Sequence, residues 1–411
     1  MPSILPDGEP VPPDGALPAR ALDGIGQRPF GFYVHIPFCA TRCGYCDFNT
    51  YTAAELGDPA GGSHSSRDTY PGQAAAEVRF ARQVVGPAEV PVRTVFFGGG
   101  TPTLLPPGQL GGLLRVIDGE FGLVPGAEVT VEANPETITP QVLAQLRAEG
   151  ITRISFGMQS AQPHVLAVLD RVNQPGRPAQ CARWAREAGF EHVSLDLIYG
   201  TPGETDRDWR ASLEAALAAG PDHISAYALI VEDGTRLAAR VRRGELPAPD
   251  DDAMADRYLI ADEVLTGHGL HWYEVSNWAA TAPDQCAHNL LYWTGGDWWG
   301  VGPGAHSHVG GTRWWNVKHP AAYAGRIAAG ASPGQGRETL TAAESQLERV
   351  MLLTRLARGC PVTELESAGR DAAAKAVADG LADPGALAAG QVVLTLRGRL
   401  LADAVIRDLT A

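Results

Sequence analysis

Short apolar runs recur between residues 31 and 230, and a helical pattern follows each of them. The runs are apolar almost throughout instead of alternating, as expected for strands of a parallel sheet that is covered on both faces. Pairs such as Thr139-Pro140 mark the helix starts between them. The six runs are Gly31–Phe38, Val92–Phe97, Glu128–Ala133, Ile151–Gly157, His192–Tyr199 and His223–Ile230. Six such β-then-α units predict a parallel barrel or an open α/β sheet.

The segments around this pattern differ from it in composition. Residues 1–28 are rich in proline, which removes backbone donors, so we expect a disordered tail there. We place the βα domain at residues 29–250, with a mobile insertion at about residues 53–67, where the sequence is small, polar and aperiodic. Residues 251–335 contain most of the tryptophans, and we expect an aromatic-rich connecting region there.

Residues 336–411 predict a small C-terminal domain that is mainly helical and resembles a winged helix. Its start carries a capping box, Thr341-Ala-Ala-Glu344, ahead of an apolar stripe. Near its end, Val392–Leu396 and Leu400–Val405 flank Arg397-Gly398-Arg399, which indicates a β-hairpin for the wing.

Charge and composition exclude several classes of protein. The chain of 411 residues has 33 Lys+Arg and 47 Asp+Glu, a net charge of −14, which disfavours a nucleic-acid partner. No apolar stretch is long enough for a membrane span, although peripheral membrane contact stays open, and the start lacks a signal-peptide pattern. Six cysteines are too few for a disulfide scaffold of this length. We therefore expect a cytoplasmic protein.

Three of the cysteines fall within eight positions, as Cys39-x3-Cys43-x2-Cys46, directly after the first predicted strand. Loops at that end of parallel strands are where such folds place their chemistry. Zinc would need a fourth ligand, and the nearby sequence has no further Cys or His to supply it. An iron–sulfur cluster with one open iron accounts for three ligands better. Cys181 and Cys360 have no such companions, and we expect both to be buried and structural.

The C-x3-C-x2-C spacing after a first strand resembles the signature of the radical S-adenosylmethionine (SAM) superfamily. The resemblance implies an incomplete (β/α)6 barrel, a [4Fe-4S] cluster held by the three cysteines, and SAM bound at the open iron. The strand-end motifs GGGTPT, VEANPET, SFGMQS, LDRVN and SLDLIYG are similar to those of the anaerobic coproporphyrinogen-III oxidase-like branch. That resemblance implies SAM contacts by Tyr33, Tyr45, Gly99, Thr101, Glu132, Gln159, Arg171 and Asp196. His35, beside the cysteines, is expected to line the same pocket.

Two departures from the oxidases resemble the haem-chaperone subgroup, called HemW. The oxidases carry a fourth cysteine two positions after the third, where this chain has Phe48. The run from His288 to Trp293 also has the H-N-x-x-Y-W pattern of that subgroup. On a helix, His288 and Tyr292 would share one face. An imidazole can ligate haem iron and an indole can lie against the macrocycle, so His288, Asn289, Tyr292 and Trp293 are the candidate haem contacts.

Other residues could also serve haem, and the local alternative for His288 is a structural histidine in an aromatic-rich region. Cys286 is a candidate soft ligand, and His306 and His308 are second-choice imidazoles. No C-x-x-C-H attachment motif is found in the chain.

Two functions of different class remain. We favour a haem carrier that passes haem to acceptor proteins while keeping a [4Fe-4S] cluster and SAM. The alternative is an oxygen-independent coproporphyrinogen-III dehydrogenase of porphyrin biosynthesis, which decarboxylates propionate side chains by radical chemistry. Radical modification of tRNA is disfavoured by the acidic balance and by the lack of a basic appended domain. Whether the chain is an enzyme is therefore left open.

Overall fold

The computed structural model describes residues 7–56, 66–171, 173–174 and 176–411. Six parallel strands form the centre of a 13-stranded sheet, in the order in which they occur in the chain. The sheet has two free edges, β1 and β8, so the barrel is incomplete, and the predicted six-unit fold is confirmed. The six strands are β2 (Phe30–Ile36), β3 (Val92–Gly99), β4 (Leu123–Ala133), β5 (Arg153–Gln159), β6 (His192–Tyr199) and β7 (His223–Ala228).

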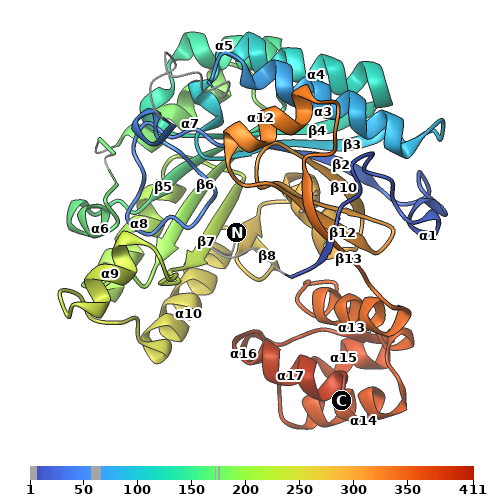
Figure 1. Cartoon of the computed structure of the whole chain (residues 1–411). Helices are drawn as coiled ribbons and strands as arrows, with labels where there is room; N and C mark the ends of the chain where they lie inside the picture. The colour runs from blue at the N-terminus through green and yellow to red at the C-terminus, as the bar shows by residue number, and fades with distance from the viewer. Residues whose placement is uncertain (1–6, 57–65, 172, 175) are drawn as a thin grey trace.

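Helices cover the outer face of the curved sheet (Figure 1). In the part of the chain described by the structure, no helix is long and apolar enough to cross a membrane. The helices of the barrel are α3 (Tyr70–Val85), α4 (Pro107–Phe121), α5 (Pro140–Ala148), α6 (Pro163–Val168), α7 (Arg177–Glu187), α8 (Asp206–Leu217), α9 (Arg236–Arg242) and α10 (Asp251–Gly267). Short 3₁₀ turns follow two of the strands, at Pro102–Leu104 and Pro135–Thr137.

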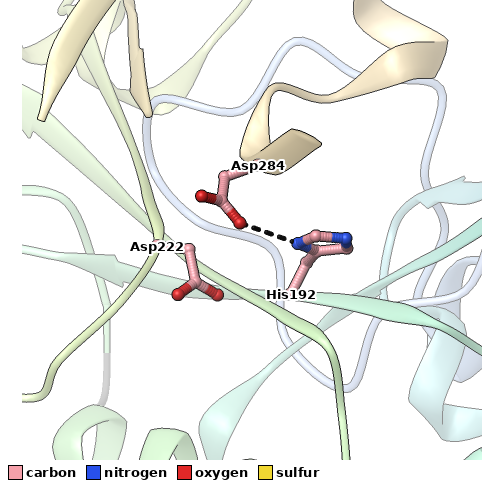
Figure 2. Close-up of side chains that lie close together, drawn as sticks. All are labelled: His192, Asp222 and Asp284. Carbon is pink, nitrogen blue, oxygen red and sulfur yellow. Dashed lines mark hydrogen bonds and ion pairs between the residues drawn. The ribbon is translucent and has the colours of Figure 1, made fainter. Parts of the chain in front are cut away.

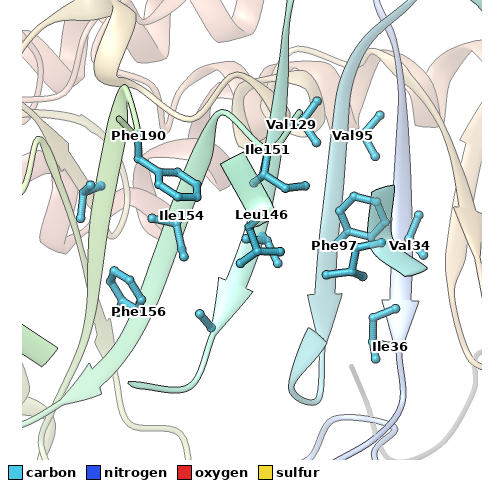
Figure 3. Packing of buried hydrophobic residues seen from close by; sticks show 14 of the residues in the cluster. Val34, Ile36, Val95, Phe97, Val129, Leu146, Ile151, Ile154, Phe156 and Phe190 are labelled. Atoms are coloured by element: carbon cyan, nitrogen blue, oxygen red, sulfur yellow. The ribbon is translucent and has the colours of Figure 1, made fainter. Parts of the chain in front are cut away.

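Side-chain alternation separates the two faces of each central strand. Val34 and Ile36 on β2, and Val95 and Phe97 on β3, belong to the buried apolar core (Figure 3). At alternate positions, Tyr33 on β2 and Phe96 on β3 point to the other face of the sheet and line the cavity inside the barrel. That inner face carries polar groups, among them Glu132, and it is the wall of the site described below.

Residues 251–335 extend this sheet on both sides. On one side β8 (His271–Glu274) and β9 (Asn277–Ala279) form a hairpin that pairs with β7. On the other side β10 pairs in parallel with β2, and three antiparallel strands follow it. These elements are β10 (Asp297–Val301), β11 (His306–Val309), β12 (Thr312–Asn316) and β13 (Gly334–Thr339), with helices α11 (Ala287–Trp293) and α12 (Pro320–Ala328) and the turn Ala282–Asp284. The aromatic-rich region is thus built into the sheet of the barrel.

The expectation of a disordered N-terminal tail is wrong for residues 7–28. β1 (Glu9–Pro10) pairs with β13, and α1 (Ala19–Leu22) follows it. A Cβ at Gly8 would lie 2.6 Å from the Trp315 ring, so the segment packs closely against the sheet edge. Proline is tolerated there because an edge strand needs few donors. Residues 1–6 lie outside the described residues, as do residues 57–65 of the expected mobile insertion, and Ala53–Leu56 form helix α2.

The C-terminal unit has a small core of its own, but its predicted hairpin is wrong. Thr395 caps a helix whose Gly398 packs on Leu381, where a Cβ would lie 1.9 Å from the Leu381 carbonyl oxygen. This close packing and the cap favour helix over strand. The unit contains α13 (Ala342–Leu353), α14 (Ser367–Ala378), α15 (Pro384–Ala388), α16 (Leu396–Leu400) and α17 (Ala402–Leu409), the strand pair β14 (Cys360–Pro361) and β15 (Gln391–Val392), and the turn Val362–Glu364.

Arg399 of α16 joins this unit to the barrel. Its guanidinium donates to Asp262 of α10 at 2.7 Å and lies 4.0 Å from the centre of the Trp272 ring on β8. We expect Arg399→Ala to lower the free energy of unfolding by about 1 to 3 kcal/mol, because it removes a charge-assisted hydrogen bond and a cation–π contact. Urea unfolding measures this. Arg397→Ala, which changes an exposed arginine on the same helix, is the control, and equal losses in both variants would contradict the assignment.

Candidate functional site

A cavity of about 630 Å³ fills the inside of the barrel. One end is formed by the cysteine loop, which follows the carboxyl end of β2. The other end is formed by α11, whose His288 contacts Gly31 and Thr94 near the starts of β2 and β3. The cavity therefore runs between the two motifs that the sequence singled out, the cysteine triad and the H-N-x-x-Y-W run.

The three predicted cysteines all line the cavity, and all are free and partly exposed. Backbone hydrogen bonds shape their loop: Cys39 N donates to Tyr51 O at 3.0 Å, and Gly44 N to Leu169 O at 3.0 Å. Burial raises the pKa of Cys46 to about 11 and also raises the pKa of Cys39. Thiols held together in a partly buried loop suit a metal cluster, because a bound cation stabilises the thiolate form that burial disfavours.

A glycine ledge at the end of β3 lies directly against this loop. Gly99 has φ +111°, a conformation that L side chains rarely adopt. A Cβ at Gly100 would lie 2.4 Å from Phe38 O and 3.1 Å from Cys39 Sγ. The glycines are therefore required for the backbone to approach the cysteine loop, and with Thr101 they form one wall of the cavity.

Two partly buried carboxyl groups, Glu132 on β4 and Asp196 on β6, face the cavity. Burial raises the pKa of Glu132 to about 8, with a further contribution from Asp196, while the 3.1 Å hydrogen bond from Gly99 N opposes the shift. Burial also raises the pKa of Asp196, which accepts a 2.8 Å hydrogen bond from Ser155. A cationic ligand in the cavity would favour ionisation of both groups. The pair thus suits a ligand that carries a sulfonium or ammonium charge.

Gln159 and Arg171 complete the wall beside the cysteines. Gln159 has φ +65° at the end of β5, and a Cβ at Gly157 would lie 2.9 Å from both side chains. Arg171 donates to Cys43 Sγ at 3.4 Å and to Gly157 O at 3.2 Å. Burial opposes its charge, but the neighbouring Cys43 and Tyr45 raise the pKa of Arg171 overall. A fixed positive charge therefore adjoins the cysteine loop.

All eight predicted SAM contacts line this one cavity, Tyr33 and Tyr45 included. The expectation that His35 lines this pocket is wrong. Its ring packs against Gly99 and is not among the residues that line the cavity. His35 Nε2 pairs with Asn49 O at 2.9 Å, and its Nδ1 pairs with the Tyr33 hydroxyl at 3.0 Å. It therefore supports Tyr33 from behind.

The H-N-x-x-Y-W run forms α11, and His288 and Tyr292 lie on one face of this helix, as their spacing of four requires. Glu128 accepts hydrogen bonds from the first amides of this helix, Ala287 N at 3.0 Å and His288 N at 2.9 Å. The His288 ring is 1% exposed, and burial lowers the pKa of this imidazole to about 3. Its Nδ1 pairs with Thr94 Oγ1 at 2.8 Å and its Nε2 with the Tyr292 hydroxyl at 2.7 Å. Both nitrogens of a neutral ring are thus engaged.

The structure brings three of the four candidate haem contacts in this run to the cavity: His288, Asn289 and Tyr292. Trp293 packs instead against the C-terminal core and does not line the cavity, so its haem contact stays a prediction. Trp293 lies five positions after His288, so the two side chains point in different directions from the helix. Cys286 also lines the cavity, whereas His306 and His308 lie on β11 outside it.

Comparison with known proteins places the chain. Residues 33–216 match the radical SAM superfamily. The chain is 53% identical to the haem chaperone HemW of Mycobacterium tuberculosis over 93% of this chain and 95% of that protein, and 36% identical to HemW of Synechocystis over 86% and 85%. This chain belongs to the HemW family. The structure of coproporphyrinogen III oxidase (HemN) from Escherichia coli, a radical SAM enzyme, has the same fold, with a TM-score of 0.80 over 95% of this chain and 92% of that one at 23% identity.

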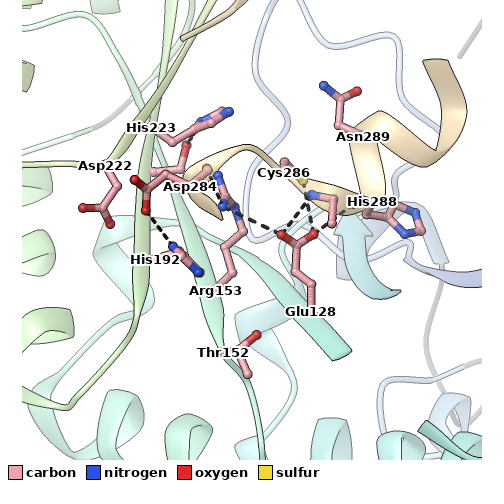
Figure 4. A network of polar contacts seen from close by, with 12 residues as sticks. Glu128, Thr152, Arg153, His192, Asp222, His223, Asp284, Cys286, His288 and Asn289 are labelled. Atoms are coloured by element: carbon pink, nitrogen blue, oxygen red, sulfur yellow. Dashed lines mark hydrogen bonds and ion pairs between the residues drawn. The ribbon is translucent and has the colours of Figure 1, made fainter. Parts of the chain in front are cut away.

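Two buried side chains on the cavity wall of this HemW family member were missed from the sequence. Arg153, at the start of β5, and His223, at the start of β7, belong to a polar network that also contains Glu128 and the start of α11 (Figure 4). His223 pairs with Ser194 at 2.7 Å. For Arg153 the available signal was a charged residue inside an apolar predicted strand, which is costly unless it is paired or binds a ligand.

A third polar cluster, formed by His192, Asp222 and Asp284, lies at the opposite end of β6 from the cysteine loop (Figure 2). His192 Nδ1 pairs with Asp284 at 3.0 Å, and Asp222 forms an ion pair with Arg186. Each of these groups already has a protein partner. We therefore interpret the cluster as a structural contact that joins β6, β7 and the segment before α11.

The raised pKa of Glu132 predicts a pH-dependent stability of protein prepared without its cofactors. An unfolded glutamate loses its proton near its ordinary pKa of 4.5, whereas the folded one keeps it up to about 8, so ionisation of Glu132 destabilises the fold as the pH rises between these values. We expect Glu132→Gln to gain about 2 to 5 kcal/mol of stability relative to wild type between pH 5 and pH 8, measured by urea unfolding.

Glu120→Gln, which changes a partly exposed carboxylate near Arg79 on the outside of the barrel, serves as the control and should show no such gain. A stability difference between Glu132→Gln and wild type that stays constant from pH 5 to pH 8 would refute the protonated state of Glu132 in the folded protein.

Proposed function

We propose that this protein is a haem chaperone, which binds haem and passes it to acceptor proteins. The observation that carries the proposal is the identity of 53% to a haem chaperone HemW over 93% of the chain. The cavity supports it, because its floor is formed by three residues of the H-N-x-x-Y-W run and its rim by Phe48, whose side chain is 47% exposed. An exposed aromatic ring at a cavity mouth suits a flat apolar ligand.

Membership of the radical SAM superfamily implies a [4Fe-4S] cluster and SAM. We assign the cluster to Cys39, Cys43 and Cys46, because they are free and line one end of the cavity. When bound, such a cluster supplies single electrons. The residues assigned to SAM line the same part of the cavity: Tyr33, Tyr45, Gly99, Thr101, Glu132, Gln159, Arg171 and Asp196.

The assignment of haem to His288 has a structural condition. Both ring nitrogens are engaged, so Nε2 can ligate iron only when the Tyr292 hydroxyl gives up its 2.7 Å hydrogen bond. Asn289 is held by Glu274 at 2.9 Å and faces the cavity beside them. We infer that Tyr292 competes with haem for His288, and that the neutral state of this buried imidazole keeps it ready as a ligand.

The second candidate is coproporphyrinogen-III dehydrogenase, and the fold shared with the Escherichia coli oxidase favours it. Phe48 argues against it, because the oxidases that the chain resembles carry a cysteine at this position. The phenyl ring of Phe48 has no proton to transfer and no sulfur to bind a metal, so it cannot take the role of a cysteine thiol.

Cluster assembly should depend on the cysteine loop alone. We expect Cys39→Ala, Cys43→Ala and Cys46→Ala each to abolish iron–sulfur absorption after anaerobic reconstitution, because three ligands hold the cluster. Cys181→Ala and Cys360→Ala, which change fully buried core thiols, are the controls and should retain the absorption. Assembly of a full cluster in Cys43→Ala would contradict the assignment of the cluster to these three cysteines.

Haem titration tests the proposed function. Wild type should bind one haem with a shifted Soret band, and His288→Ala should lose at least about tenfold in affinity, because axial ligation is lost. Tyr292→Phe should bind haem about fivefold more tightly than wild type, because Nε2 no longer forms a hydrogen bond of about 1 kcal/mol. Unchanged affinity and Soret position in both variants would contradict haem ligation by His288.

A further inference from the structure

Arg153 is a buried cation that the proposed function does not yet use. It stands at the start of β5, its side chain is 2% exposed, and it faces the cavity. Burying a guanidinium is costly unless all of its donors are paired. The partners of each donor therefore show whether Arg153 serves the fold alone.

One side of the guanidinium is anchored. Its Nη1 donates to Asp284 O at 2.8 Å and lies 3.8 Å from Glu128 Oε2 (Figure 4). Glu128 in turn is committed to the amides that start α11, from which it accepts hydrogen bonds of 3.0 and 2.9 Å. These contacts fix the position of the guanidinium but leave part of its hydrogen-bonding capacity unused.

The other side of the guanidinium has no partner. Its Nη2 is buried and makes no hydrogen bond to any residue that the structure describes. The neighbouring Thr130 on β4, which is paired in register with Arg153 and lines the same cavity, also has a buried hydroxyl without a partner. Two unsatisfied buried donors therefore belong to paired residues of adjacent strands that line one cavity, which is the arrangement of a small polar binding site.

A guanidinium and a hydroxyl that lie close together are suited to bind a carboxylate. A guanidinium N–H and a hydroxyl can both donate to one anionic group, and a charge-assisted bond in a buried site is strong. The adjacent His223 cannot supply positive charge, since burial lowers the pKa of its imidazole well below the usual value and both of its nitrogens are paired. The carboxyl groups of Glu132 and Asp196 lie on the cavity wall farther along their strands, toward the cysteine loop. Arg153 is thus the positively charged side chain at the α11 end of the cavity.

We propose that Arg153 and Thr130 form a carboxylate subsite that binds a propionate side chain of haem. The inference rests on the proposed function and deepens it, because it names the part of haem that this end of the cavity recognises. His288 and Tyr292 line the same cavity, and His288 pairs with Thr94 near the start of β3, so the iron ligand and the propionate subsite belong to one floor.

Haem and its dimethyl ester test this subsite, because esterification removes the anionic charge and little else. Full-length protein carrying its cluster is titrated with each porphyrin in the same buffer, and the affinity ratio is measured. Wild type should prefer haem by about tenfold or more. Arg153→Gln should reduce the preference to about twofold or less by weakening haem binding and leaving ester binding unchanged. Thr130→Val, which keeps the shape of the side chain, should reduce the preference by about threefold.

The exposed Arg183→Gln is the control and should keep the wild-type ratio, and circular dichroism checks that each variant is folded. Equal affinity of wild type for haem and its ester would overturn the subsite, as would an equal loss for both in Arg153→Gln and in Thr130→Val. A loss of SAM affinity in Arg153→Gln with the porphyrin ratio unchanged would assign the carboxylate to SAM and also overturn it. Failure of wild type to bind either porphyrin would overturn the proposed function itself.

Discussion

The alternation of side chains along six parallel strands is the constraint on which the rest of this structure depends. Val34, Ile36, Val95 and Phe97 pack in the apolar core, and this frees the alternate positions to face the barrel interior. Polar groups on that inner face are buried, so each needs a partner or a ligand. Apolar packing on the outer face of the sheet therefore stabilises the barrel, and the polar groups on the inner face form the wall of the cavity.

The two ends of the cavity are built differently. At the cysteine end, loops that follow the strands approach one another through glycines, and Gly100 lies against Phe38 and Cys39. At the floor, α11 from a later part of the chain is attached by the bonds from its amides to Glu128. The outer side of α11 packs on the C-terminal core through Trp293, and that unit is itself joined to the barrel by Arg399. The floor is therefore supported from both domains, whereas the cysteine end belongs to the barrel alone.

Local patterns in the sequence were sufficient for the six strands and the cysteine triad, because periodicity and spacing are local properties. Features that depend on distant partners could not be predicted in this way. The N-terminal segment is ordered by β13, more than 300 positions away, and α16 is favoured by close packing of Gly398 on Leu381. The same holds for Arg153, whose burial and missing partner appear only when β4, β5 and the segment before α11 come together.

The central claim is that this cavity carries haem and does not decarboxylate a porphyrinogen. The most direct measurement is carbon dioxide release from coproporphyrinogen III by anaerobically reconstituted protein, with reductant and SAM present. The account predicts no release above that of Cys43→Ala, from protein that binds one haem per chain under the same conditions. Sustained release over many turnovers by the wild-type protein would contradict it.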